Sequence, residues 1–146
     1  MRYAGFTRQE RNFITLMRLL IVVFLGAAAL FAAIPDILLN YINDIGKVFL
    51  GWQSPPIAAG GDLWRVMAVA HNICLAYACA VAQGSALRNA NYARIVLIAL
   101  AAQAAGFAAM IFLDGPQFYY LAAAAADLAA FLLTLRIYTS SARSRS

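Results

Sequence analysis

The sequence predicts an all-α protein, an integral membrane four-helix bundle. Apolar residues make up 64% of the 146 residues and the mean hydropathy is +0.76, whereas soluble domains contain roughly 45–50% apolar residues. Four stretches meet or approach the roughly 20 apolar residues that a helix needs to span a bilayer. They cover about residues 14–34, 63–83, 95–113 and 118–135. We therefore expect residues 1–146 to form a single transmembrane domain.

Basic residues at the ends of these stretches predict the orientation. Nine of the eleven Lys and Arg residues lie before or at the start of the first span, between the second and third, or after the fourth: Arg2, Arg8, Arg11, Arg18, Arg88, Arg94, Arg136, Arg143 and Arg145. By the positive-inside rule these segments are cytoplasmic. The prediction is an N-in/C-in, multi-pass protein of a bacterial cytoplasmic (inner) membrane. No nucleic-acid partner is expected, because no basic face interleaved with aromatic residues accompanies the net charge of +5.

The first span has an alternative interpretation as a cleaved signal peptide. A basic start, an apolar run at residues 19–25 and small residues at 27–29 are the features of such a peptide. The apolar run continues through Leu30, Phe31 and Ile34, however. That continuation favours a full membrane span.

Residues 35–61 form the one long connection, on the predicted outer side. Its first half has apolar residues at helical spacing, interrupted by polar ones, and predicts an amphipathic segment in the outer membrane interface. Gly51 and the Ser54-Pro55-Pro56 turn end this segment. We expect the connection to cap the bundle, and the alternative is a lid or a docking surface for a partner.

The second span opens with a charged residue near its outer end, Arg65. Asp62 and Asp114 are predicted at a similar height and would neutralise its guanidinium. Two interpretations stay open. The three residues form a salt-bridged clasp between the outer ends of the spans, or Arg65 belongs to a site for an anion or a lipid headgroup.

Polar residues that reach neither membrane surface are the candidate functional site. Counted from the predicted span ends at about 1.5 Å per residue, His71 and Gln103 lie about 12 Å deep and Asp127 about 14 Å deep. Asn72 is adjacent to His71. A carboxylate in hydrocarbon should face inward and find a partner, for which His71 is the candidate. Such a cluster would pass protons or orient a ligand, or it would be a hydrogen-bond network that sets the helix register.

Small residues are frequent in the third and fourth spans. Gly106 follows Ala104 and Ala105, and alanines fill positions 122–126. Small side chains let helix backbones approach closely in a membrane, where apolar side chains alone gain little over lipid. We expect these faces to pack against the other spans or against other membrane subunits.

Neither a metal site nor a catalytic motif is predicted. Cys74 and Cys79 have the wrong spacing for a metal pair and are not accompanied by further Cys or His ligands. With a single histidine the chain cannot ligate a haem on both faces, so haem would have to be shared between two copies through His71. No cofactor is predicted, and a quinone or a lipid is the alternative kind of bound molecule. The absence of a catalytic signature favours a protein that is not an enzyme.

Several short motifs resemble the DoxX-like group of small bacterial four-helix membrane proteins. They are Trp64-Arg65, Gly106-Phe107, Asp114-Gly115-Pro116, Asp127 and Leu132-Leu133. The resemblance covers about residues 14–138, and residues 35–61 have no counterpart in it. It implies a four-helix bundle and, since members of the group have been linked to redox or quinone-related roles, a faint expectation of such a role.

Two functions follow from these observations. The first is an accessory or structural subunit that packs through its alanine-rich and glycine-rich faces in a larger bacterial membrane complex. The alternative is an autonomous, DoxX-like protein, alone or as a homo-oligomer, that handles a small ligand in a redox-linked or proton-coupled way through His71, Gln103 and Asp127. The direction in which the polar cluster points distinguishes the two, because a subunit would bury it and a ligand-handling protein would expose it to a cavity.

Overall fold

Helices account for nearly all of the described chain. The computed structural model describes residues 7–54, 62–85 and 88–143. Five helices are present in this part: α1 (Arg8–Ala33), α2 (Pro35–Leu50), α3 (Asp62–Ala82), α4 (Ala90–Leu113) and α5 (Phe118–Arg143). All except α2 are long and apolar enough to cross a membrane. The all-helical class is confirmed, and the four predicted spans coincide with the helices that are long and apolar enough to cross a membrane.

Helices α1, α4 and α5 are longer than the apolar stretches that predicted them. Helix α1 begins at Arg8 because Thr7 forms a capping box with Glu10: the Thr7 hydroxyl accepts from the Glu10 amide and the Glu10 carboxylate accepts from the Thr7 amide. Helix α1 ends at Ala33, because Ile34 precedes Pro35 and a residue before proline disfavours helical geometry. Pro35 then opens α2, where its missing amide hydrogen is not needed.

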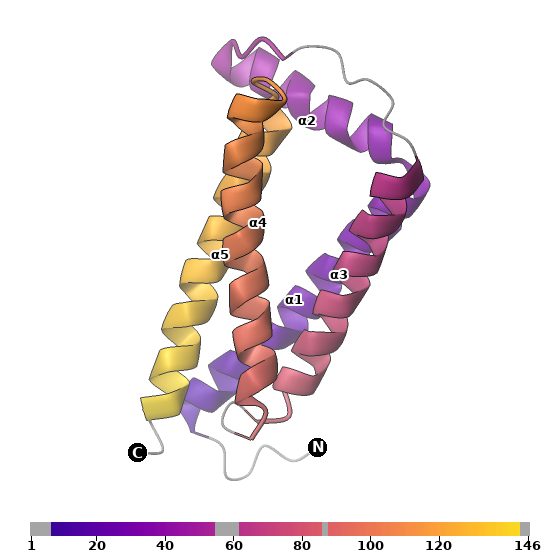
Figure 1. Cartoon of the computed structure of the whole chain (residues 1–146). Helices are drawn as coiled ribbons and strands as arrows, with labels where there is room; N and C mark the ends of the chain where they lie inside the picture. Colours follow the sequence, from indigo (N-terminus) through magenta and orange to yellow (C-terminus); the bar gives the residue numbers. More distant parts are fainter. Residues whose placement is uncertain (1–6, 55–61, 86–87, 144–146) are drawn as a thin grey trace.

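The four long helices form two antiparallel pairs. Helix α1 packs mainly on α3, and α4 packs mainly on α5. The pairs meet at the end of the molecule that carries both termini, and they diverge toward the other end, which α2 crosses (Figure 1). We call these the terminal end and the capped end.

The hydrophobic core occupies only the terminal half of the bundle. Its buried members come from three short segments, within residues 13–24 of α1, 75–82 of α3 and 93–100 of α4. Residues between 130 and 138 of α5 pack against them. The core contains no residue of the capped halves of α3, α4 and α5. Tight packing therefore joins the two helix pairs on one side of the midplane only.

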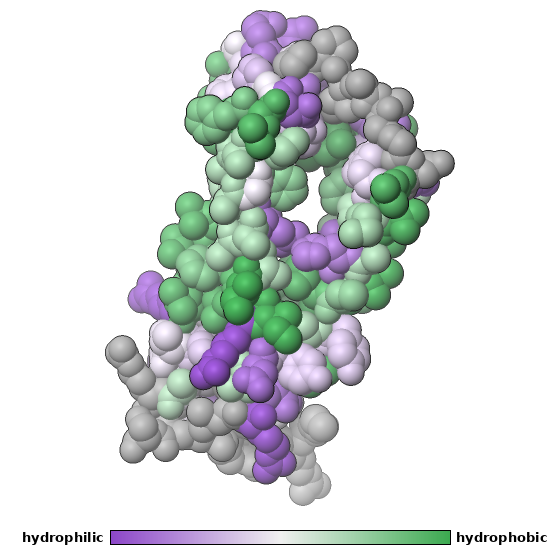
Figure 2. Space-filling model, in the orientation of Figure 1, coloured by the Kyte–Doolittle hydropathy of each residue, from purple (hydrophilic) through white to green (hydrophobic). Residues whose placement is uncertain are grey.

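An opening separates the helix pairs in the capped half. The space-filling view shows it as a hole through the molecule, framed by α2 and the two pairs, with hydrophilic residues at the edge nearer the terminal end (Figure 2). Because side chains are drawn in this view, the hole is not filled by them. The two helix pairs are thus joined by the hydrophobic core at the terminal end and by α2 at the capped end.

Candidate functional site

Four polar residues of α5 lie on one stripe of that helix. Tyr120, Asp127, Thr134 and Ser141 follow one another at intervals of seven residues, which is close to two turns. Thr134 is 0% exposed and Ser141 1% exposed, whereas Asp127 is only partly buried. The stripe is thus buried at Thr134 and Ser141 in the terminal half and again at Tyr120, which is 7% exposed, near the capped end. Asp127 is the accessible position between them.

His71 occupies the corresponding position on α3. It shares a face with Ala78 and Ala82, seven and eleven residues further along the helix. Ala78 is 4% exposed and Ala82 0%, and both belong to the core that includes residues of α4. His71 is exposed. Since the same face is buried where α4 contacts α3, the exposure of His71 follows from the divergence of the two helices.

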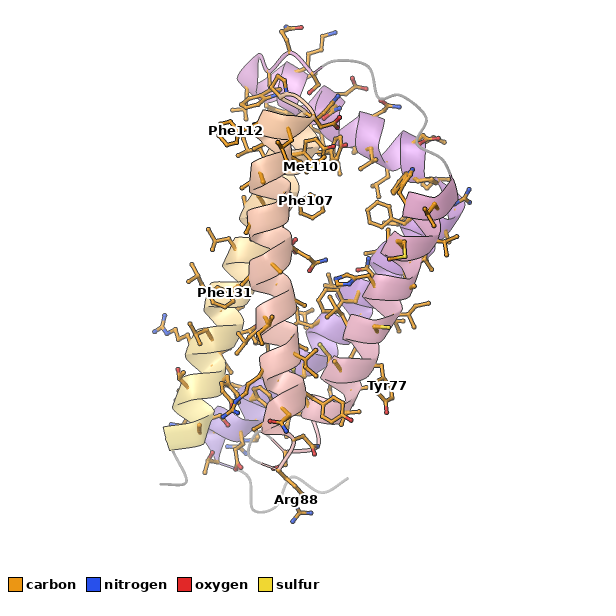
Figure 3. All side chains as sticks on the ribbon, in the orientation of Figure 1. Tyr77, Arg88, Phe107, Met110, Phe112 and Phe131 are labelled. Atoms are coloured by element: carbon orange, nitrogen blue, oxygen red, sulfur yellow. The ribbon has the colours of Figure 1, made fainter. Side chains whose placement is uncertain are left out.

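On α4 the change from a buried to an accessible face occurs at Gln103. Val96, seven residues earlier on the same face, is 0% exposed, whereas Gln103 is only partly buried. Phe107 and Met110 follow Gln103 on this face, and both labelled side chains lie on the side of α4 that borders the opening (Figure 3). The Gln103 Oε1 atom is buried and accepts no hydrogen bond within the described residues.

Two ring contacts give the relative heights of these side chains. The Phe107 and Tyr120 ring centroids lie 6.4 Å apart, so these residues of α4 and α5 lie at a similar height along the bundle. Gln103 lies four residues, or about 6 Å, closer to the terminal end, and Asp127 seven residues, or about 10 Å. Gln103 and Asp127 therefore differ in height by about one helical turn.

The second ring contact places His71. The Tyr77 and Tyr92 ring centroids are 6.5 Å apart, so these residues of α3 and α4 lie at a similar height along the bundle. His71 lies six residues, or about 9 Å, toward the capped end from Tyr77, and Gln103 eleven residues, or about 16 Å, from Tyr92. The three polar residues are therefore spread over about one and a half helical turns around the midplane, one from each of three helices.

The predicted partnership of His71 with Asp127 is not formed by direct contact. Among the described residues neither side chain makes a hydrogen bond or an ion pair. Asn72 is buried and donates to the Ala68 carbonyl at 2.8 Å, within its own helix. Asn72 thus belongs to the packed face of α3, and His71, Gln103 and Asp127 belong to the opening.

The outer polar residues are held by separate partners. Arg65 donates to the Ala32 carbonyl near the end of α1, where the helix dipole favours a cation. Phe31 and Trp64 add an edge-to-face ring contact to the same junction. Asp114 accepts from the Tyr120 hydroxyl on the other helix pair. The side chain of Asp62, the first residue of α3, lies outside the described residues.

Sequence reasoning missed the junction between α2 and the α4–α5 turn. Asn43 donates to the Gln117 side chain at 2.6 Å and accepts from the Tyr119 amide at 3.0 Å. Ser54 accepts from the Phe118 amide at 3.1 Å. These two side chains satisfy amides that open α5, which have no partners within the helix. The only signal in the sequence was Asn43 on the apolar side of an amphipathic segment.

A further group of contacts completes the junction. Trp52 donates its indole N–H to the Pro116 carbonyl, and its ring packs on Phe118 at 6.1 Å. Gly46 faces Phe118 so closely that a Cβ atom there would overlap the ring. The junction therefore holds the C-terminal end of α2 against the α4–α5 pair. Helix α2 thus borders the opening at the capped end.

Metal ligands do not gather in the part of the chain that the structure describes. No group of three or more His, Cys, Asp or Glu residues there could hold a metal ion. Cys74 is exposed, Cys79 is buried, and both are free thiols. The chemistry of the opening is therefore that of one imidazole, one amide and one carboxylate.

Comparisons with known proteins leave the site without a precedent. No protein-family model matches the sequence, and no curated protein or solved structure is significantly similar to the chain. The resemblance to DoxX-like proteins stays a prediction.

Proposed function

We propose that this protein binds a small, membrane-soluble molecule in the opening between its two helix pairs. This is the ligand-handling function of the two that the sequence suggested. One observation carries it: on α3 and α4 the polar residue of the interior face sits where that face changes from buried to accessible, and on α5 Asp127 is the accessible residue of an otherwise buried polar stripe. A subunit that used these residues only to set helix register would enclose them.

The polar side chains of the opening favour a bound molecule there. Ionisable and amide groups at membrane depth are costly unless they are paired, and they mark substrate or ion pathways when they face a cavity. Ligand sites in helical bundles are built from side chains on facing helices. Here Gln103 and Asp127 contribute from one pair and His71 from the other, with the rings of Phe107 and Tyr120 nearby. A molecule with a polar head and an apolar body fits these walls.

The proposal includes a location and an orientation. We place the protein in a bacterial cytoplasmic membrane with both termini inside. In support, both termini lie at one end (Figure 1), and Arg88, in the connection between α3 and α4, extends from that same end (Figure 3). Helix α2 would lie in the outer interface, since Ile37, Tyr41 and Phe49 are exposed on it.

Photo-crosslinking in native membranes tests the proposal. A photoreactive benzoylphenylalanine at position 71 should capture the occupant of the opening. The same residue at position 77 is the matched control, because Tyr77 is on the same helix, 64% exposed and directed away from the opening (Figure 3). Mass spectrometry of the adducts is the readout.

The adduct masses decide the outcome. A defined adduct at position 71 that is absent at position 77 supports the proposal. The same mixture of bulk phospholipids at both positions would show that the opening is ordinary lipid contact, and would refute it.

The outward faces of α4 and α5 favour the accessory-subunit function as a second candidate. Phe112 is 88% exposed and Leu113 79% at the capped end of α4, and in Figure 3 Phe112 extends away from the bundle. Lipid or another membrane protein would cover such residues. Native mass spectrometry of gently extracted protein distinguishes these, since a subunit would co-purify with larger chains in a fixed ratio.

A further inference from the structure

The unpaired groups in the opening are hydrogen-bond acceptors. The buried Oε1 atom of Gln103 has no donor among the described residues. The Asp127 carboxylate likewise has no hydrogen-bond or ion-pair partner there. Buried polar atoms are nearly always hydrogen-bonded, so an exception calls for an explanation. Of the two acceptors, the Asp127 side chain is partly accessible, whereas the buried Gln103 Oε1 atom would meet a ligand only after its side chain turns toward the opening. Both call for a ligand that donates.

The described part of the chain supplies no cation to Asp127. Arg65, on the same helix as His71, is six residues closer to the capped end and is bonded to the Ala32 carbonyl. Arg18 donates to Gln83 at the terminal end at 3.1 Å. His71, the other titratable group of the opening, makes no ion pair with Asp127. Asp127 therefore faces the opening as a carboxylate without a counter-ion.

The remaining wall of the opening suits a cation as well as an apolar body. The Phe107 ring borders the opening one turn from Gln103 (Figure 3), and Tyr120 lies against it. Aromatic faces attract ammonium groups through their quadrupole, most strongly when water is excluded. The Asp127 carboxylate and the Phe107 ring are the accessible groups of this wall, and both attract a cation.

We infer that the opening selects an amphiphile with a protonated amine head, whose ammonium group would pair with Asp127 and donate to Gln103 while its apolar chain lies between the helix pairs. This inference rests on the proposed function, since it names the class of ligand for the same opening. The ammonium supplies both the positive charge and the hydrogen-bond donors that the two side chains lack.

Three probes with the same chain and different heads test the inference. Radiolabelled decylamine, decanol and decanoate are bound at equilibrium to the protein in lipid nanodiscs, with empty nanodiscs as the blank for partitioning. Decylammonium should bind roughly tenfold more tightly than decanol, because charge-assisted hydrogen bonds are the stronger ones. Decanoate should bind most weakly, since its charge repels Asp127.

Two variants assign the preference to one side chain. Asp127→Asn keeps the size of the side chain and should reduce the preference for decylammonium over decanol to within about twofold, with decanol binding retained. Asp44→Asn is the matched control: it removes the same charge from an exposed position on α2 and should leave the preference unchanged.

The outcomes separate the inference from the proposed function. Equal binding of decylammonium and decanol, unaffected by Asp127→Asn, would overturn the inference and leave the proposed function standing. No saturable binding of any probe, together with indistinguishable photo-adducts at positions 71 and 77, would overturn both. The ranking of the probes on the unmodified protein tests the inference even if Asp127→Asn does not fold.

Discussion

At the scale of single residues, Gly46 shows how closely α2 approaches α5. A Cβ atom at this position would overlap the ring of Phe118, whereas a Cβ atom at Gly26 of α1 would meet nothing within 4 Å. Both glycines lie inside helices. The two positions therefore separate the effect of space from the effect of helix propensity.

We predict opposite effects of alanine at the two glycines. Gly46→Ala should destabilise the protein by about 1–3 kcal/mol, since overpacking forces side chains and backbone to shift. Gly26→Ala should be neutral or stabilising by up to about 1 kcal/mol, because alanine is the better helix former. Thermal unfolding in detergent, followed by circular dichroism, measures both. Equal effects would contradict the close packing of α2 on Phe118.

At the scale of elements, Asn43 joins α2 to the start of α5. Its side chain both donates to Gln117 and accepts from the Tyr119 amide, so it acts as a cap supplied by another helix. Caps within one helix contribute about 0.5–2 kcal/mol. Since Asn43 is buried, its loss would also leave groups of the α4–α5 turn without hydrogen bonds.

We predict that Asn43→Ala loosens the α4–α5 turn. The stability of this junction should fall by about 1–3 kcal/mol, because buried polar groups lose their partner. Hydrogen exchange of the Tyr119 amide should accelerate accordingly. Asn40→Ala, at an exposed position one turn away on α2, is the control and should leave the exchange unchanged. Unchanged exchange in Asn43→Ala would exclude the cap.

At the scale of the whole molecule, the bundle is closed in its terminal half and open in its capped half. Tyr77 of α3 and Tyr92 of α4 lie in ring contact in the closed half. His71 and Gln103, further toward the capped end on the same helices, face the opening. The distance between α3 and α4 thus increases along the bundle, as the ribbon shows (Figure 1).

We predict that a short bifunctional thiol reagent distinguishes the two halves. In a background without Cys74 and Cys79, the pair Tyr77→Cys and Tyr92→Cys should cross-link rapidly. The pair His71→Cys and Gln103→Cys should react slowly, because the helices have diverged there and the two positions also differ by about 7 Å in height along the bundle. Gel mobility after proteolysis between α3 and α4 measures both. Equal rates would show that the helices remain parallel and the opening is closed.

The helical class, the four helices apolar enough to span a membrane and the polar residues between them were predictable from the sequence alone. Apolar length and helical spacing are local properties, so they follow from the order of residues. The tertiary structure was needed to show that the core lies mainly in one half of the bundle, that His71 and Asp127 make no contact with each other, and that Asn43 and Gly46 hold α2 against α5. These features depend on how helices distant in sequence diverge or meet, and packing of that kind leaves no periodic signal in the sequence.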